Sequence, residues 1–329
     1  MKLRKILAAV LSCALIATSL VAVTGCNETT GTTEPAEKTY TVGICQIAQH
    51  PALDAATEGF KRALTEKLGD KVKFDEQNAS GDSATCATII NQFVSSNVDL
   101  IMANATPSVQ AAATGTPDIP ILGTSVTEYG IALGINDFTG KTGINISGTS
   151  DLAPLDQQAA MFQELLPDVK KVGIVYNSGE PNSKYQADVI SKELAKLGVE
   201  TAEFTFSDSN DIAQVVTKAC EESEALYIPT DNACATNANI INDVAEPAGK
   251  PIIAGEEGIC KACGIAALSI SYDKIGYLTG VMAYDILVNG KNPGDMEIQS
   301  DEEPAYKYNP ALCEKYGITV SDKYSAIEG

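Results

Sequence analysis

The sequence has no tryptophan, a single histidine and few basic residues for its size. Its 329 residues include 23 lysines and arginines against 43 aspartates and glutamates, which gives a formal net charge of −20. Nucleic acids are bound through clustered Lys and Arg, so this balance excludes them as partners. Aromatic residues make up only 6% of the chain, which disfavours ligands such as sugars that stack on aromatic rings. With 44% hydrophobic residues, the chain still has enough apolar material for folded cores.

The residues needed for covalent catalysis are missing as well. His50 is the only histidine, and no G-x-S-x-G elbow accompanies it, so we expect no enzyme. Cys260 and Cys263 have C-x-x-C spacing, which suits a redox pair, half a zinc site, a local disulfide or two buried thiols. No second pair with this spacing completes a set of metal ligands. We therefore expect neither a metal nor a cofactor.

The N-terminus carries the most specific short signal. Positive charges come first, an apolar run follows at Ile6–Val23, and a small residue then precedes Cys26. This order is typical of a signal peptide, here residues 1–25. The Gly25-Cys26 ending resembles the lipobox of bacterial lipoproteins, which implies a lipid on Cys26. The alternative is a single transmembrane anchor. Residues 26–38 are rich in Thr, Glu, Gly and Pro and are expected to form a flexible tether.

From Thr39 onward, short β-rich runs alternate with segments of helical periodicity. This alternation predicts an α/β fold of parallel strands joined by crossover helices. Two such series of similar size are separated by the polar stretch Gly140–Pro154, which predicts two Rossmann-like lobes with a cleft between them. The expected helices are Pro51–Leu68, 82–95, one from Pro107, Leu155–Leu166, Asn182–Leu197, Asp211–Cys220 and Ala233–Ala248. The expected strands are Tyr40–Ile47, one from Val72, Asp99–Ala103, Ile119–Leu122, Lys171–Tyr176, Glu200–Phe206, Ala225–Pro229 and Pro251–Ala254.

In parallel α/β sheets, ligands bind beyond the carboxyl ends of the strands, where loops lead into helix N-termini. The loops at these positions are rich in small, amide and hydroxyl side chains, as a site for a polar small molecule should be. They are residues 46–53, 77–83, 104–108, 123–127, 177–183, 229–233 and 255–258. We expect the cleft between the lobes to be the ligand site.

Several of these loops resemble one family. The motifs are His50-Pro-Ala-Leu-Asp54, Gln77-Asn-Ala-Ser-Gly-Asp82, Tyr176-Asn-Ser178 with Asn182-Ser183, and Pro229-Thr-Asp-Asn232. In order and spacing, over Tyr40–Thr319, they look like the tryptophan- and tyrosine-binding branch of the substrate-binding proteins of ABC transporters. The resemblance implies a type I periplasmic-binding-protein fold with a hinge that closes the cleft over an aromatic amino acid: tyrosine, tryptophan or phenylalanine. It also implies a permease and an ATPase as partners.

The resemblance also sets the expected domain limits and location. In such folds the chain returns to the first lobe late. Lobe 1 is therefore expected at residues 39–148 and 264–292, and lobe 2 at residues 149–263 and 293–329. A lipid on Cys26 would hold the protein at the extracellular face of the cytoplasmic membrane.

An amino-acid ligand brings one carboxylate and one ammonium group. Free N–H groups at a helix N-terminus favour an anion. The expected donors to the carboxylate are therefore Asn177, Ser178, Asn182 and Ser183. Asp231 is the expected partner of the ammonium, with Glu256 and Glu257 as further acidic candidates. For Asn182, Ser183 and Asp231 the alternative is plain helix capping.

The remaining predicted contacts surround the rest of the ligand. His50 precedes the first helix, where it suits a wall of the pocket, with capping or a surface position as the alternative. The other expected contacts are Gln46, Pro51, Leu53, Asn78, Thr106, Ser125, Thr127, Thr230 and Asn232. Candidates for stacking on an aromatic ligand are Tyr129, Tyr176 and Tyr185.

Two other functions stay open. One is a sugar- or nucleoside-binding protein of the same fold. The other is a surface adhesin or sensory receptor that uses the fold for protein contacts, which a large exposed apolar patch would favour. A transcriptional regulator with the same lobes is excluded by the export signal and by the lack of a basic helix-turn-helix before Thr39.

Overall fold

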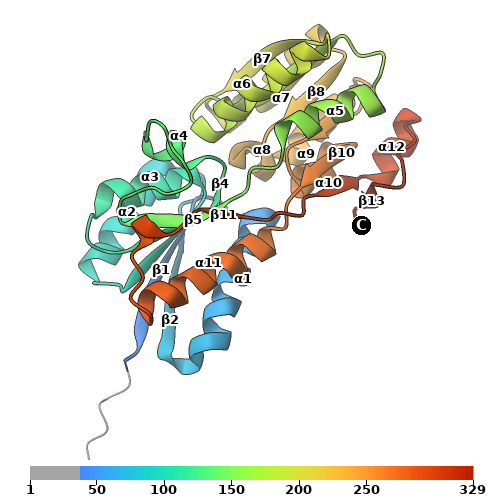
Figure 1. Ribbon diagram of the computed structural model, residues 1–329. Coiled ribbons are helices and arrows are strands. Elements are labelled where there is room, and N and C mark those ends of the chain that lie inside the picture. Colours follow the sequence, from blue (N-terminus) through green and yellow to red (C-terminus); the bar gives the residue numbers. More distant parts are fainter. Residues whose placement is uncertain (1–37, 329) are drawn as a thin grey trace, which may run out of the picture. The chain divides into compact units, whose positions relative to one another are not determined.

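The computed structural model describes residues 38–328. The predicted signal peptide, the lipidation site Cys26 and the tether up to residue 37 lie outside these residues, as does Gly329. Within them the strands form two separate sheets, each covered by helices on both faces (Figure 1). The expected α/β class with two parallel sheets is confirmed. We use lobe 1 for the first sheet with its helices and lobe 2 for the second.

The sheet of lobe 1 has the strand order β11-β5-β4-β3-β1-β2, and its paired strands are parallel. Its central strand β3 is buried on both faces: Leu100 and Met102 point to one layer of helices, Ile101 and Ala103 to the other. Such two-sided burial produces the continuous apolar run seen in the sequence. The strands are β1 (Tyr40–Gln46), β2 (Val72–Asn78), β3 (Leu100–Asn104), β4 (Ile121–Val126), β5 (Ile146–Ser150) and β11 (Gln299–Ser300).

Helices α1 and α11 cover one face of this sheet, and α2, α3 and α4 cover the other. Local sequence sets where they begin. Pro51 occupies the first turn of α1, and the carboxylate of Asp82 accepts a hydrogen bond from the Ala84 amide at the start of α2 (2.9 Å). The helices are α1 (Pro51–Leu68), α2 (Ser83–Ser95), α3 (Thr106–Gly115), α4 (Tyr129–Leu133) and α11 (Tyr272–Leu287), with short 3-10 turns at Gly69–Lys71 and Pro293–Asp295.

The sheet of lobe 2 has the order β13-β12-β10-β9-β8-β6-β7. Its strands are parallel except that β12 runs antiparallel to β10. They are β6 (Lys171–Asn177), β7 (Glu200–Phe206), β8 (Ala225–Ile228), β9 (Ile252–Ala254), β10 (Ala266–Ser269), β12 (Ala305–Tyr308) and β13 (Ser325–Ala326).

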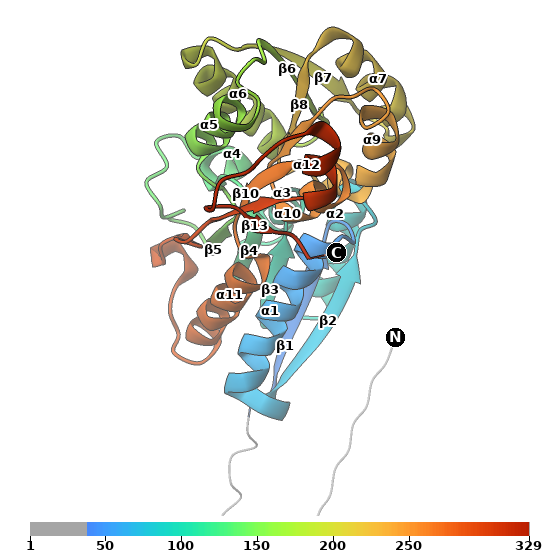
Figure 2. The ribbon, with the colours of Figure 1, turned by 90° about the vertical axis from the view of Figure 1, so that its right-hand side faces the viewer.

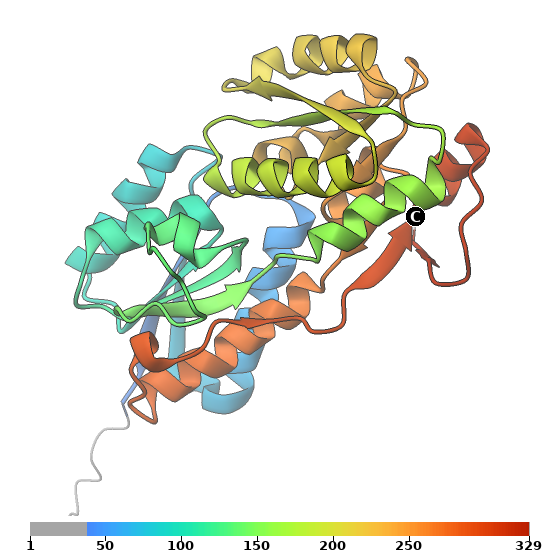
Figure 3. The same cartoon turned by 45° about the horizontal axis from the view of Figure 1, so that its top comes forward.

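Helices α5, α6 and α12 pack on one face of this second sheet, and α7 to α10 pack on the other. Figure 3 shows α6 and α7 on opposite sides of the strands. The helices are α5 (Leu155–Leu165), α6 (Pro181–Lys196), α7 (Ile212–Glu222), α8 (Asn232–Thr236), α9 (Ala238–Ala245), α10 (Glu257–Cys263) and α12 (Pro310–Tyr316), with a 3-10 turn at Ser209–Asp211. Over residues 38–328, no helix combines the length and the apolar character that crossing a bilayer requires.

Two local predictions were wrong. The polar stretch Gly140–Pro154 contains β5, whose Thr149 hydroxyl lies 3.1 Å from that of Thr124 and 2.9 Å from that of Thr279. These buried hydroxyls satisfy one another, so a polar segment can be an inner strand. The single helix expected at Ala233–Ala248 is divided into α8 and α9. Asn237 between them is non-helical, with φ −113° and ψ 21°.

The chain passes between the sheets at three places within the described residues. It does so after β5, between β10 and α11, and between β11 and β12. The return to lobe 1 falls at Tyr272 and not at residue 264, because β10 pairs with β9 and β12 of the second sheet. The later boundary also differs from the expected residue 292, because β11 still pairs with β5 of the first sheet.

The seven cysteines among residues 38–328 are all buried, and their thiols are free. In α10 the thiol of Cys260 donates to the carbonyl of Gly264 (3.6 Å), and that of Cys263 to the carbonyl of Ile259 (3.3 Å). Each sulfur thus has a backbone partner of its own. Of the alternatives for the C-x-x-C pair, the structure has two buried thiols.

Helices α1 and α11 lie side by side across the outer face of the first sheet (Figures 1 and 2). Glycines allow them to approach closely. A Cβ on Gly276 of α11 would lie 2.0 Å from the carbonyl oxygen of Ala56, and one on Gly59 of α1 would lie 2.3 Å from that of Asp273. No real Cβ tolerates such distances, so glycine at these positions fixes the spacing of the two helices.

We expect Gly276→Ala to destabilise the protein although alanine favours helices, because the methyl group would force α1 and α11 apart. Overpacking of this kind costs about 1–3 kcal/mol, measurable by urea unfolding of the purified protein. Thr65→Ala, at an exposed position of α1, is the matched control and should stay within about 0.5 kcal/mol of the wild type. Equal stability of Gly276→Ala and the wild type would contradict the close packing.

Candidate ligand-binding site

A small enclosed cavity lies where the carboxyl ends of strands from both sheets meet. Lobe 1 contributes residues from α1 and from the end of β4, and lobe 2 contributes residues from α6, α8 and α10 and from the loop after β8. Asp151, on the first connection between the lobes, and Tyr272, the first residue of α11, complete the lining. The lining residues are His50, Leu53, Ser125, Thr127, Asp151, Asn182, Thr230, Asp231, Asn232, Ala235, Glu256 and Tyr272.

Unsatisfied polar atoms gather in this cavity. Among residues 38–328, five buried side-chain oxygens lack a hydrogen-bond partner, and three of them belong to lining residues: Ser125 Oγ, Asp151 Oδ1 and Asn182 Oδ1. Buried polar atoms normally have partners, so three such atoms in one cavity mark positions open to hydrogen bonds from a polar ligand or an ordered water. The Asn182 amide is oriented by its Nδ2, which donates to the Thr230 carbonyl (3.0 Å) and to Glu180 Oε2 (3.1 Å). Its free oxygen therefore offers an acceptor.

The charges around the cavity are all of one sign. Asp151, Asp231 and Glu256 line it, and no Lys or Arg does. Burial raises the pKa of Asp151 to about 6 and that of Glu256 to about 7, and it also raises the pKa of Asp231. Burial lowers the pKa of His50, so its imidazole is neutral at pH 7. Such a cavity suits a ligand group that carries positive charge.

The wall from lobe 2 is held by two buried carboxylates. Asp231 Oδ1 accepts from the Cys234 amide (2.8 Å), and its Oδ2 accepts from the Asn177 amide (2.8 Å) and from the Ser183 hydroxyl (2.7 Å). Glu180 Oε2 accepts from both the amide and the side chain of Asn232, at 3.0 and 2.7 Å. Burial raises the pKa of Glu180 to about 8.

The wall from lobe 1 has an unusual backbone. Ser125 at the end of β4 has φ 55°, and Ala105 after β3 has φ 81°. Left-handed backbone at non-glycine residues costs about 1–3 kcal/mol and gathers at ligand sites. His50 Nε2 lies 3.3 Å from Asn232 Oδ1 of lobe 2, so the two walls touch beside the cavity.

Not all predicted contacts lie in this cavity. The predicted residues that line it are His50, Leu53, Ser125, Thr127, Asn182, Thr230, Asp231, Asn232 and Glu256. Asn78 and Asn177 line a wider cleft on its outer side, and Pro51 lines a cavity behind it. Gln46, Thr106, Ser178 and Ser183 line none of the three. Gln46 is instead part of a buried network in which Thr57 donates to its Oε1 (2.7 Å).

The structure also corrects the expected stacking residues. The Tyr129 hydroxyl donates to the Thr149 carbonyl within the core (3.2 Å), Tyr176 bonds to Glu203, and Tyr185 lies in a surface groove beside α5. The tyrosine that does line the cavity is Tyr272, which sequence reasoning missed together with Asp151 and Ala235. It also missed Glu180, which lines the wider cleft and holds Asn232 in place. Asp151 directly follows the unexpected strand β5, so the error in the fold also concealed the residue.

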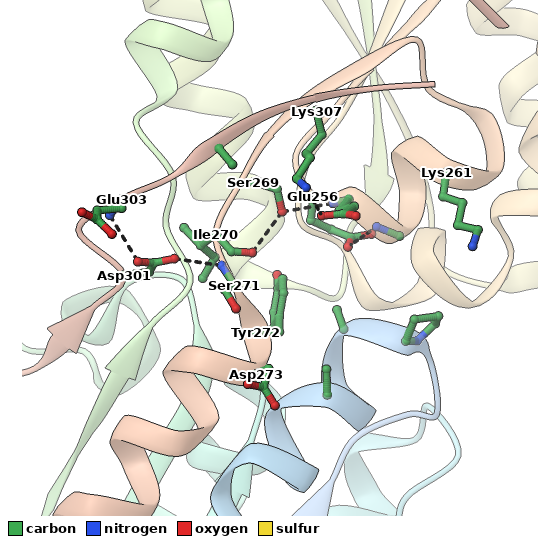
Figure 4. A pocket seen from close by; sticks show the side chains of 16 residues that line it. Glu256, Lys261, Ser269, Ile270, Ser271, Tyr272, Asp273, Asp301, Glu303 and Lys307 are labelled. Atoms are coloured by element: carbon green, nitrogen blue, oxygen red, sulfur yellow. Dashed lines mark hydrogen bonds and ion pairs between the residues drawn. The ribbon is translucent and has the colours of Figure 1, made fainter. Parts of the chain in front are cut away.

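A second cavity lies behind the first, at the connections between the lobes. Figure 4 shows its lining, with Ser271 near Tyr272 and Asp301, and Glu256 near Ser269 and Lys307. Tyr272 and Glu256 line both cavities. Within the described residues, none of the orphaned buried oxygens belongs to a residue that lines only this rear cavity. The polar ligand is therefore expected between the lobes.

Two α/β lobes with a polar cavity between them are the arrangement of a protein that binds a small solute between its lobes. Residues 41–328 match the model of the family described as ABC transporter substrate binding protein. The chain belongs to this family. The predicted type I periplasmic-binding-protein fold is confirmed by the solved relatives.

Individual relatives are similar over most of their length. A tyrosine-binding protein of Clostridioides difficile (strain R20291) is 38% identical over 291 residues, which cover 85% of this chain and 84% of that protein. An ABC domain from Streptococcus pneumonia in complex with L-Trp is 29% identical with a TM-score of 0.83, covering 87% of this chain and 97% of that one.

A third relative is the ligand-free, open structure of a substrate binding protein with adhesive properties from Clostridium difficile. It is 34% identical, covers 88% of this chain and 99% of that one, and has a TM-score of 0.68. The score is lower than for the L-Trp complex although the sequence identity is higher. This is expected if the lobes of the present structure lie closer together than those of an open one.

The pKa of Glu256 predicts how stability depends on pH. Its folded-state pKa of about 7 lies above the ordinary value of 4.5, so the folded protein binds this proton more tightly than the unfolded chain. The contribution of Glu256 to stability is thus fully present below pH 4.5 and is lost as the pH rises through 7. Relative to Glu256→Gln, which cannot titrate, the wild type should lose about 3 kcal/mol across this window.

Urea unfolding of both proteins at several pH values between 4.5 and 8 measures this difference. The Gln variant also changes two hydrogen bonds from the Gly258 and Ile259 amides, but that effect does not vary with pH. If the stability difference between the two proteins stays constant across this pH range, burial does not raise the pKa of Glu256.

Proposed function

We propose that this ABC substrate-binding protein captures an aromatic amino acid, with tyrosine, tryptophan and phenylalanine as the candidates. The observation that carries the proposal is the enclosed cavity with three carboxylates, three orphaned polar atoms and no basic side chain among its lining residues. The relatives that are named for tyrosine and that hold L-Trp support the same ligand class.

Each part of an amino acid finds matching groups in the lining. The acidic side chains suit its ammonium group. The hydroxyls of Ser125 and Thr127 at the end of β4 are donors for its carboxylate, and the orphaned Ser125 Oγ is free to act. Leu53, Ala235 and the neutral His50 offer apolar surface to its side chain. We propose the nine predicted residues of the cavity as ligand contacts. Asn182 and Ser183 have protein partners, so the hydroxyls of lobe 1 replace them as donors to the carboxylate.

Capture requires that the lobes move about their connections. We propose that lobe 1 comprises residues 39–150 and 272–300 and that lobe 2 comprises residues 155–269 and 305–328, with the three short segments between them as the hinge. A ligand that contacts both lobes favours the closed arrangement over the open one. The contact between His50 and Asn232 would form on closure and add to that preference.

The substrate-binding proteins of ABC transporters act outside the cytoplasm and deliver the solute to a membrane transporter. Membership of the family implies a permease that receives the solute and an ATPase that drives import. We propose that it binds and releases the ligand without changing it, and that a lipid on Cys26 anchors it at the extracellular face of the cytoplasmic membrane.

Calorimetric titration tests the ligand class. We expect saturable one-to-one binding of an aromatic amino acid and no binding of sugars or nucleosides. Ser125→Ala should weaken binding about 10-fold or more, because a hydrogen bond to a charged group contributes about 1.5–3 kcal/mol. Ser96→Ala, an exposed serine of the same lobe, should bind like the wild type. Saturable binding of a sugar or nucleoside alone would overturn the ligand class and keep the fold.

The anchor is tested by Cys26→Ser in the full chain. We expect the wild type to sediment with membranes and to partition into detergent, because a diacylglycerol adds about 0.8 kcal/mol of membrane affinity per buried CH₂. The variant should lose this partitioning. If both proteins were released into the medium alike, a lipid on Cys26 would be refuted.

A further inference from the structure

The acidic side chains that line the cavity differ in how many hydrogen bonds their oxygens already accept. Each oxygen of Asp231 already accepts from an amide, and the two oxygens of Glu256 cap α10 by accepting from the Gly258 and Ile259 amides. Both carboxylates therefore have structural duties at helix N-termini, where the positive end of the helix dipole also compensates their charge.

Asp151 differs from both. It is 4% exposed, and its Oδ2 accepts from the Tyr272 hydroxyl at 3.0 Å, while its Oδ1 has no partner. No cation lies among the residues that line the cavity to compensate its charge. A buried carboxylate oxygen without hydrogen bond or counter-ion costs free energy unless a ligand supplies one.

The position of Asp151 ties it to the hinge. It is the first residue after β5, on the first connection between the lobes, and its backbone amide donates to the Val126 carbonyl at 3.3 Å. Tyr272 is the first residue of α11, directly after the second connection. Their hydrogen bond thus joins the first connection to the start of α11, directly after the second, and Tyr272 lines both cavities.

We propose that Asp151, on the connection between the lobes, binds the ammonium group of the ligand and so makes closure depend on that group. This inference rests on the proposed function and names one contact within it. Asn182 Oδ1 of lobe 2, the other orphaned acceptor of the cavity, can share the ammonium, whose three N–H groups need several acceptors. The cation would then link the hinge to lobe 2 in the closed form.

The Asp151 side chain is charged at neutral pH, as binding of an ammonium group requires. Its pKa of about 6 leaves it largely ionised at pH 7, and a bound ammonium would hold it so. Asp231 has a structural role in this arrangement. It ties the end of β6 to α8 through the Asn177 and Cys234 amides, and its position beside the cavity shapes the wall.

The test compares L-tyrosine with 3-(4-hydroxyphenyl)propanoate, which lacks only the amino group. Calorimetry on the wild type should show a preference for tyrosine of about 100-fold, typical of a buried charge pair. In Asp151→Asn, affinity for tyrosine should fall by a similar factor and the preference should shrink to within about threefold. Asp156→Asn, an exposed aspartate at the start of α5, is the matched control and should keep the preference.

A structure of the wild-type complex decides the contact directly, including the case in which the variant binds neither ligand measurably. The ammonium nitrogen is expected within about 3.2 Å of a carboxylate oxygen of Asp151. An ammonium placed on Asp231 or Glu256, or a full preference retained by Asp151→Asn, would overturn the inference and keep the proposed function. A wild type that binds no amino acid would instead sink the proposed function itself.

Discussion

The enclosure of several carboxylates between two lobes, with no basic side chain among the residues that line the cavity, is the constraint on which the site depends. Asp231 and Glu256 tolerate burial because amides at the N-termini of α8 and α10 donate to them. Asp151 does not cap a helix: it accepts from the Tyr272 hydroxyl, and the Thr127 hydroxyl also favours its charged form. Of the three groups, Asp151 is therefore the one that we propose for the positive group of the ligand, because its Oδ1 has no partner.

Parallel strands explain why these groups meet. Each strand of such a sheet leads through a loop into a helix, so polar loop residues and helix N-termini gather at one edge. Here two sheets turn that edge toward one cavity, and the segments that connect them pass along its floor with Asp151 and Tyr272. Close packing of α1 on α11 through glycine fixes the position of α11, which begins with the lining residue Tyr272.

Much of the fold could be predicted from residue patterns. Helix α1 was placed to the residue because Pro51 and the apolar periodicity mark its limits. Apolar strands such as β3 were recognised because burial on both faces leaves a continuous apolar run. Strand β5 was missed because its hydroxyls are satisfied by threonines distant in the sequence. The break at Asn237 was missed because the residues on both sides of it keep helical periodicity.

The sequence by itself determined the class of fold, the loops that form the site and the polar residues His50, Ser125, Asn182 and Asp231, because these depend on local patterns and on the direction of parallel strands. Only the tertiary structure decided which polar atoms already have partners. Asp231 accepts from amides of α8 and β6, Ser183 donates its hydroxyl to Asp231, and Asp151 has one oxygen without a partner. Whether a buried polar atom has a hydrogen-bond partner depends on groups that folding brings together from distant parts of the chain. Patterns of neighbouring residues therefore cannot predict it.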